Sequence, residues 1–249
     1  MVKVGCRMAF AKVCKMTVPF ENGRYGVRFA QTADDIAACQ ALRHQCFLGA
    51  DGIEADRFDD GSLHLMIANE AGLVCTARII LLRSFDDISH SYAAQSYDFK
   101  GLFGDAPILE FGRFCIRPGA DDPDVLRLAW GALAQLVDAH NAAYIIGCAS
   151  FAGVDASAYT AGFGLLARRY LGAVAVPTIA DDAFDLVDAG LPAGGAQIPP
   201  LLRSYLAMGG WVGQRAVVDP VMQTIHVFTA LEIAKIPAAR ARALRRMIA

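Results

Sequence analysis

The hydrophobic positions in the first third of the chain predict a strand, a helix and a hairpin, in that order. Residues 25–30 have the composition of a strand. Thr32, followed three residues later by Asp35, is typical of a helix N-terminus, and apolar residues then recur every three or four positions. Residues 64–69 and 73–82 follow as two apolar runs separated by a short glycine-containing turn. This spacing predicts two antiparallel strands.

The remaining apolar segments continue the alternation of strands and helices. Asp122 before Pro123 indicates a helix start, because aspartate is favoured at the N-cap and proline at the first helical position. Gly209 and Gly210 end another helical pattern. The later segments predict strands over 109–117, 144–151, 211–218 and 226–233, helices from 122, over 156–171 and from 199, and a basic C-terminal helix.

The segment Leu109–Pro118 places a carboxylate and a guanidinium inside an otherwise apolar strand. Leaving half of such a buried pair without its partner costs on the order of 3–5 kcal/mol. Simple alternation puts Glu110 and Arg113 on opposite sheet faces. A β-bulge at Gly112 would bring them to one face and leave a backbone N–H unpaired. The pattern fits a catalytic pair beside an N–H donor, and it also fits a structural ion pair.

Composition and charge limit the classes of function. The 249 residues are 55% hydrophobic and 19% charged, with a mean hydropathy of +0.36. No apolar run reaches the roughly 18 residues that a membrane span requires, so we expect a soluble protein with at most a peripheral membrane contact. The net charge of −2 argues against a general nucleic-acid binder.

Cysteine use and the N-terminal region indicate the compartment and the domain organisation. The seven cysteines form no C-x-x-C pair and have apolar neighbours, which favours buried thiols in a reducing compartment. We find no secretory signal and expect a cytoplasmic protein. Residues 1–24 are predicted to form a basic arm, and residues 25–249 a single domain with a C-terminal extension from about 190.

A series of charged and aromatic positions carries a family resemblance: Arg43-x-x-x-Phe47, Asp56-x-x-Asp59, His64-Leu65, Arg78, and Glu110-x-x-Arg113. In this order of elements they resemble the branch of the GNAT superfamily of N-acyltransferases that depends on acyl carrier protein and is related to acyl-homoserine-lactone synthases. The fuller match is to the bacterial ornithine N-acyltransferases that make lyso-ornithine lipid. The stretches that carry it are 56–65, 109–118, 147–153, 199–206 and 213–219. The resemblance implies an α/β (α+β) GNAT-like fold, with a central mixed, mostly antiparallel sheet flanked by helices.

The stretch Pro118–Asp124 bears on the acyl donor. Related acetyltransferases bind the pyrophosphate of coenzyme A at a glycine-rich turn before a helix, where backbone N–H groups favour anions. Here that place holds three aspartates, which would repel a pyrophosphate. We therefore expect a donor carried on the phosphopantetheine of an acyl carrier protein, with no further cofactor and no metal. The alternative is that Asp121 and Asp122 only cap the helix.

Amide formation from a thioester needs a base and a donor for the oxyanion. Glu110 is the candidate base, worth about 10²–10⁴ in rate, acting directly or through water. Backbone N–H groups near Phe111 and Gly112 are the candidate oxyanion donors, each worth about 10²–10³. Covalent catalysis through Cys115 or Cys148 has little support, because neither cysteine has a neighbouring histidine.

The other candidate residues would bind substrate. Arg43, Arg78 and Arg113 carry three guanidiniums on predicted core elements. By resemblance, at least one of them binds a substrate carboxylate or pantetheine, and another holds Glu110 in place. Asp56 and Asp59 could receive the side-chain ammonium of ornithine, or could belong to a solvated acidic loop. Ser150 could bind pantetheine or the leaving sulfur, or could be a small core residue. The full predicted binding set is Arg43, Phe47, Asp56, Asp59, Arg78 and Ser150, and the predicted catalytic residues are Glu110 and Arg113.

The resemblance implies transfer of a 3-hydroxyacyl chain from acyl carrier protein to the α-amino group of L-ornithine, giving lyso-ornithine lipid, in the cytoplasm at the inner membrane. Three alternatives stay open. An acyl-homoserine-lactone synthase would need aromatic residues before Asp56 to bind S-adenosylmethionine, and these are missing. Another acceptor, such as glutamine, lysine or glycine, would leave a similar skeleton. A non-catalytic carrier-protein or lipid-binding module is disfavoured by the intact Glu110 and Arg113.

Overall fold

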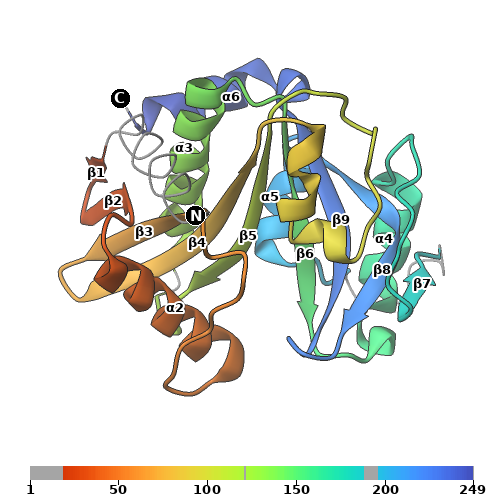
Figure 1. Ribbon diagram of the computed structural model, residues 1–249, viewed down its shortest axis with the longest axis horizontal. Helices are drawn as coiled ribbons and strands as arrows, with labels where there is room; N and C mark the ends of the chain where they lie inside the picture. The colour runs from red at the N-terminus through yellow and green to blue at the C-terminus, as the bar shows by residue number, and fades with distance from the viewer. Residues whose placement is uncertain (1–18, 121, 188–195, 249) are drawn as a thin grey trace, which may run out of the picture. The chain divides into compact units, whose positions relative to one another are not determined.

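The computed structural model describes residues 19–120, 122–187 and 196–248, and the chain divides into two compact units (Figure 1). The first unit comprises residues 1–81, 109–142 and 238–249, and the second comprises residues 82–108 and 143–237. Each has its own set of strands and its own covering helices. The prediction of a single domain over 25–249 stays a prediction.

The strands of the first unit follow the order in which they occur in the sequence. Antiparallel pairing joins β1 to β2, β2 to β3 and β3 to β4, and β5 lies beside β4. Residues 20–24, assigned to the basic arm from the sequence, form β1 and the turn into β2, while residues 1–18 of that arm lie outside the described residues. The bounds are β1 Phe20–Asn22, β2 Tyr25–Phe29, β3 Leu63–Asn69, β4 Gly72–Leu82 and β5 Ile108–Ile116. The predicted hairpin and the predicted charged strand are confirmed.

Helix α2 (Ala33–Leu48) begins at the predicted capping residues. The Thr32 hydroxyl accepts the Asp35 N–H, and the Asp35 carboxylate in turn accepts the Thr32 N–H, which is a complete capping box. The helix ends at Gly49, whose φ of 68° lies in the left-handed region that glycine adopts without strain. Its N–H bonds to the carbonyl of Gln45. Both ends of α2 are thus determined by local sequence.

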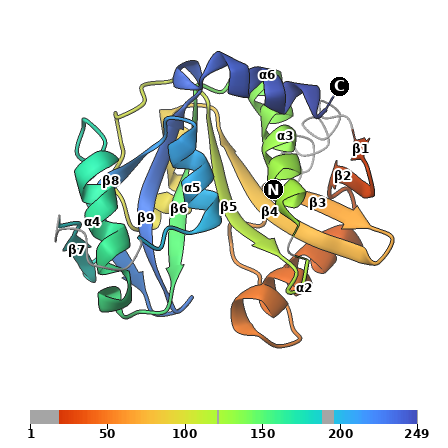
Figure 2. The ribbon, with the colours of Figure 1, turned by 180° about the vertical axis from the view of Figure 1, so that it is seen from behind.

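Helix α3 (Pro123–His140) covers the face of the first unit's strands opposite to α2 (Figures 1 and 2). Its N-cap is Asp122, as predicted, and the carboxylate accepts the Asp124 N–H. Helix α6 (Ala238–Arg246) lies beside α3 and is tied to it by the Arg245–Asp138 ion pair at 2.6 Å. The predicted apolar face of α3 is buried throughout: Val125, Ala129, Leu133, Leu136 and Val137. Burying a Val or Leu side chain stabilises the fold by about 1.5–3 kcal/mol.

The second unit pairs its strands in the order β6-β9-β8-β7, all antiparallel. Helices α4 and α5 cover one face, and an apolar cluster that includes Phe151, Phe163 and Val227 lies beneath them. Gly162 is required in α4, because a Cβ there would lie 2.7 Å from the carbonyl oxygen of Gln197. The bounds are β6 Tyr144–Ala152, α4 Thr160–Arg169, β7 Ala183–Asp185, α5 Pro200–Ala207, β8 Trp211–Asp219 and β9 Thr224–Glu232.

Residues 83–107, which precede β5, show no regular hydrophobic pattern in the sequence. They cover the face of the second unit's strands opposite to α4 and α5. They contain two 3-10 turns, Phe85–His90 and Ala93–Gln95. Tyr97 and Phe99 then pack against Phe228 of β9, with ring centroids 5.5 and 5.4 Å away. Tertiary packing of aromatic side chains therefore orders this stretch. Within the described parts of the chain, no helix is both long and apolar enough to cross a membrane.

Candidate functional site

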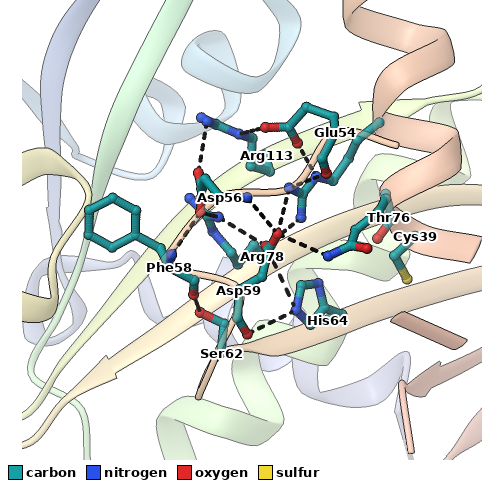
Figure 3. A network of polar contacts seen from close by, with 12 residues as sticks. Cys39, Glu54, Asp56, Phe58, Asp59, Ser62, His64, Thr76, Arg78 and Arg113 are labelled. Carbon is teal, nitrogen blue, oxygen red and sulfur yellow. Dashed lines mark hydrogen bonds and ion pairs between the residues drawn. The ribbon is translucent and has the colours of Figure 1, made fainter. Parts of the chain in front are cut away.

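A buried network of carboxylates and guanidiniums lies in the first unit, where the loop 49–62 meets α2, β4 and β5 (Figure 3). Each guanidinium comes from a different regular element, and all three carboxylates come from the loop. Three positive charges thus face three negative charges in a largely water-free region. The members are Arg43 of α2, Arg78 of β4, Arg113 of β5, and Glu54, Asp56 and Asp59 of the loop.

Arg43 is fully buried and fixes the loop to α2. Its Nη1 lies 2.7 Å from Oδ1 of Asp59, and its Nη2 lies 3.1 Å from Oδ2. Its Nε donates to the side chain of Glu54, and Nη2 also donates to the Glu54 carbonyl at 2.7 Å. Burial alone would lower the pKa of Arg43, but the hydrogen bonds with Asp59 and Glu54 outweigh it and raise the pKa. With most donors engaged inside the protein, Arg43 is suited to positioning the loop.

Asp59 is the most enclosed carboxylate of the network. Besides Arg43, it accepts hydrogen bonds from Nη1 of Arg78 at 3.0 Å, Nε2 of Gln40 at 3.1 Å and the backbone N–H of Asp56 at 3.1 Å. Burial raises its pKa, but the hydrogen bond and charge of Arg43, with the Asp56 N–H and the charge of Arg78, bring the pKa far below its ordinary value. The predicted partner of a substrate ammonium is therefore an ionised carboxylate that already pairs with two guanidiniums.

Asp56 forms ion pairs with the guanidiniums of Arg78 and Arg113. Its Oδ1 accepts from Arg78, and its Oδ2 accepts from Nη2 of Arg113 at 3.0 Å. The Arg78 guanidinium also lies 5.6 Å from the ring centre of Phe58, within cation–π range. The side chain of Asp56 is 23% exposed, against 10% for Glu54 and 7% for Asp59. Asp56 is thus the carboxylate of this network that water reaches best.

The backbone of β5 is distorted at Arg113. Its φ of 51° lies in the left-handed region, which costs a residue with a side chain about 1–2 kcal/mol. The sequence placed the irregularity at Gly112, and the left-handed residue is the next one along. Phe111 is buried, and Gly112 is half-buried. Such strain persists only where surrounding contacts determine it, and it clusters at functional sites.

Glu110 and Arg113 lie on the same strand, and both are shielded from water. Glu110 is 3% exposed. The Arg113 side chain, 11% exposed, forms ion pairs with Glu54 at 3.1 Å and Asp56 at 3.0 Å. Arg113 is therefore tied to the loop, a partnership that the sequence did not predict. The roles of Glu110 as base and of the Phe111 and Gly112 N–H groups as oxyanion donors remain predictions.

The last two predicted binding residues lie outside this network. Phe47 is half-buried and lies one helical turn after Arg43 on α2. Ser150 belongs to the second unit, where it is exposed on β6 and pairs in register with His226 of β9. Their roles in binding stay predictions.

Sequence reasoning missed one member of the network, Glu54. It is one more acid in a polar loop, and no local pattern sets it apart. His64 borders the network at Asp59. It is fully buried, with Nε2 3.5 Å from the carbonyl of Asp59. Burial lowers the pKa of His64, so its imidazole is neutral at pH 7.

The cysteines and acidic clusters offer little for other chemistry. A hydrogen bond with Cys46, together with burial, raises the pKa of Cys115 strongly, so this thiol is protonated at neutral pH. Such a thiol is a poor nucleophile, which agrees with the sequence argument. Over residues 19–120, 122–187 and 196–248, no group of three or more His, Cys, Asp or Glu residues is placed to hold a metal ion.

The start of α3 is held by a paired carboxylate. Asp122 accepts hydrogen bonds from Nη2 of Arg24 at 2.9 Å and from the Tyr25 hydroxyl at 3.0 Å, as well as from the Asp124 N–H. These hydrogen bonds, first of all the one from the Asp124 N–H, lower the pKa of Asp122. The Asp122 carboxylate therefore occupies the N-terminus of α3, with the Arg24 guanidinium as its charge partner. Asp121 lies outside the described residues.

Comparison with known proteins agrees with the predicted family. Residues 39–131 match the family described as the acetyltransferase (GNAT) domain. The L-ornithine N(alpha)-acyltransferase of Rhodobacter capsulatus is 29% identical over 237 residues, covering 84% of this chain and 90% of that protein. The protein of the same name from Brucella abortus is 28% identical over 245 residues, covering 86% and 87%.

A solved structure supports the fold. An N-acyl amino acid synthase from uncultured soil microbes, FeeM, superposes with a TM-score of 0.50 at 12% sequence identity. The match covers 86% of this chain and 94% of that one. At this identity the likeness concerns the fold alone, and the predicted GNAT-like fold is confirmed.

Proposed function

We propose a specific reaction for this chain, which is an acyltransferase with a GNAT-like fold: transfer of a 3-hydroxyacyl chain from an acyl carrier protein to the α-amino group of L-ornithine, giving lyso-ornithine lipid. The observation that carries this proposal is the similarity to two proteins named L-ornithine N(alpha)-acyltransferase, which extends over more than four fifths of each chain. The predicted motifs from Arg43 to Arg113 all fall inside the matched GNAT domain.

The proposed chemistry is a single displacement at a thioester. The α-amine nitrogen attacks the carbonyl carbon, the C–S bond breaks, and the phosphopantetheine thiol leaves with a proton. Glu110 removes the proton from the ammonium, directly or through water, which is worth about 10²–10⁴ in rate. Backbone N–H groups near Phe111 and Gly112 stabilise the oxyanion. The left-handed backbone of the next residue, Arg113, supports this assignment, because β5 departs from regular strand geometry there.

Recognition of ornithine requires an anion for its side-chain ammonium and a cation for its carboxylate. Asp56 suits the first role better than Asp59, because its side chain is more exposed and bears a less enclosed charge. For the carboxylate, Arg113 is better placed than Arg43 and Arg78, because its side chain is 11% exposed and theirs are 0% and 2% exposed. Phe47 and Ser150 complete the proposed binding set.

The proposed donor is a carrier-bound thioester. The Asp122 carboxylate already accepts the Asp124 N–H and so competes with a pyrophosphate for the start of α3, whereas phosphopantetheine on a carrier protein brings no nucleotide to that point. We also propose that the protein works in the cytoplasm at the inner membrane, since the product is a lipid. No metal or further cofactor takes part in the proposed displacement.

A thiol-release assay with two donors and a panel of acceptors tests the proposal. The purified protein is incubated with a 3-hydroxyacyl carrier protein, or with the matching coenzyme A thioester, and with single amino acids. We expect rapid release of the carrier thiol with ornithine and slower release with the coenzyme A donor, because the Asp122 carboxylate already occupies the start of α3. Parallel incubations with glutamine, lysine or glycine in place of ornithine test which amino acid is the acceptor.

The alternatives give different results in the same assay. Release that requires S-adenosylmethionine would establish a lactone synthase. Release with another amino acid but not with ornithine would show that the acceptor is that amino acid, while the proposed displacement at the thioester would stand. Equal rates with both donors would show that Asp122 does not select against a coenzyme A donor. No release with any acceptor, from a protein that still binds acyl carrier protein, would indicate a non-catalytic module.

A further inference from the structure

Glu54 shares one carboxylate between two guanidiniums that come from different elements of the first unit. Its Oε1 lies 3.1 Å from Nε of Arg113 on β5, and its Oε2 accepts from Nε of Arg43 on α2. The side chain is only 10% exposed. Each carboxylate oxygen therefore has a guanidinium partner, and Glu54 forms a direct link between α2 and β5 within this unit (Figure 3).

The two ends of this link differ in burial, with the Arg43 side chain 0% exposed and the Arg113 side chain 11% exposed. Arg43 is fully buried and is held by three further contacts, two to Asp59 and one to the backbone carbonyl of Glu54 itself. Both the backbone and the side chain of Glu54 are thereby fixed to one guanidinium. Arg113, in contrast, carries the left-handed backbone conformation. The Arg43 end is the anchor, and Arg113 is the group that this anchor holds.

We propose that Glu54 is a positioning residue, which holds the side chain of Arg113 and through it maintains the left-handed backbone conformation of β5 next to Phe111 and Gly112. A residue with a side chain relaxes toward negative φ unless its surroundings prevent it. The link from Glu54 supplies this constraint, with a second contact from Asp56 at 3.0 Å. This inference rests on the proposed function only where it assigns oxyanion donors to this stretch.

Replacing the carboxylate by an amide weakens the link without changing its size. In Glu54→Gln, one of the two oxygens becomes an NH₂ group that faces a guanidinium and cannot accept from it. Asp56 still contacts Arg113, so the fold persists while the strand gains freedom to relax. A matched control is Asp35→Asn, which breaks the Arg28–Asp35 pair at the other end of α2, outside the network.

Hydrogen exchange, measured without substrate, tests the positioning directly. We expect the amides of residues 111–116 to exchange at least about tenfold faster in Glu54→Gln than in the original protein, whereas Asp35→Asn leaves them unchanged. In Arg113→Gly, glycine adopts the left-handed conformation without help, so adding Glu54→Gln to that variant should change exchange by less than about twofold. Unchanged exchange in Glu54→Gln, or the same acceleration with and without Arg113, would overturn the inference.

Steady-state kinetics separate positioning from general loss of structure. Glu54→Gln should lower kcat at least about fivefold while KM for the acyl donor stays within twofold, because the affected N–H groups act on the transition state. Asp35→Asn should lower the melting temperature and leave kcat unchanged. A rise in KM with kcat unchanged would contradict the positioning role. If the proposed reaction fails altogether, the exchange measurement still decides whether Glu54 holds β5, so the two failures are distinguishable.

Discussion

Arg43 and Asp59 form a two-point ion pair inside the first unit, with Nη1 at 2.7 Å from Oδ1 and Nη2 at 3.1 Å from Oδ2. The side chains are 0% and 7% exposed. Two charges withdrawn from water in this way are tolerated only when each keeps its partner. The pair holds loop 49–62 against α2, and the remaining contacts of the network are built on it.

Replacing Asp59 should therefore destabilise the fold strongly. Asp59→Asn keeps the size of the side chain but removes one buried charge that two guanidiniums share, leaving Arg43 with Glu54 and Arg78 with Asp56, and it should lower the free energy of unfolding by about 3–5 kcal/mol. Urea denaturation at pH 7 measures this loss. The control is Asp138→Asn, which breaks an exposed pair with Arg245 and should cost less than about 1 kcal/mol. Similar losses in the two variants would contradict the role given to the network.

The same carboxylate should make stability depend on pH in a predictable direction. The pKa of Asp59 in the folded protein lies far below its unfolded value of about 3.9, so the folded state binds fewer protons than the unfolded one. Its stabilising contribution is present in full above about pH 5 and is lost as the pH falls through 4 and below. Between pH 6 and pH 3, the free energy of unfolding should fall more steeply with decreasing pH for the original protein than for Asp59→Asn. Parallel curves would show that Asp59 does not titrate as described.

Glu110 is the residue whose removal should affect turnover most directly. Glu110→Gln preserves size and burial but cannot accept the proton, and it should lower kcat at least about tenfold while the protein remains folded. The matched control is Glu232→Gln, which loses only an exposed pair with Lys235 and should keep full activity. Turnover in Glu110→Gln within twofold of the original would remove this residue from the catalytic set.

Tyr97 should matter for the stability of the second unit. Its buried hydroxyl donates to the carbonyl of His226 at 2.8 Å and lies 3.1 Å from the Nδ1 atom of the same residue. Tyr97→Phe would leave these buried groups without this partner, which should cost about 1–3 kcal/mol in unfolding free energy. Tyr92→Phe, which removes a half-buried contact with Asp219, should cost less. Equal effects would show that burial does not set the energy of this hydrogen bond.

Local sequence was sufficient for much of the fold. The start of α2 follows from Thr32 and Asp35, and the start of α3 follows from Asp122, because the interacting groups lie within three residues of one another. The β3–β4 hairpin likewise follows from two apolar runs around a short turn. The stretch 84–104 could not be predicted in this way, since its order comes from Tyr97 and Phe99 packing on a strand more than a hundred residues later in the chain.

The candidate site shows the same division. Sequence motifs identified five members of the network, but they did not reveal which charges meet. The Arg113–Glu54 contact joins residues 59 positions apart, and neither periodicity nor spacing encodes such a pair. Arg113 was expected to pair with Glu110, and its ion pairs with Glu54 and Asp56 depend on how the loop folds back over β5. The left-handed backbone at Arg113 also follows from tertiary contacts, because arginine has no local preference for it.

The most direct test of the proposed reaction is the identity of the product. Mass spectrometry follows the incubation of the purified protein with a 3-hydroxyacyl carrier protein and with ornithine labelled on its α-nitrogen. We predict a single amide that carries the acyl chain on the labelled nitrogen, formed in equal amount to the released carrier thiol. Acylation of the side-chain nitrogen, or thiol release with only the unesterified hydroxy acid as product, would contradict the account.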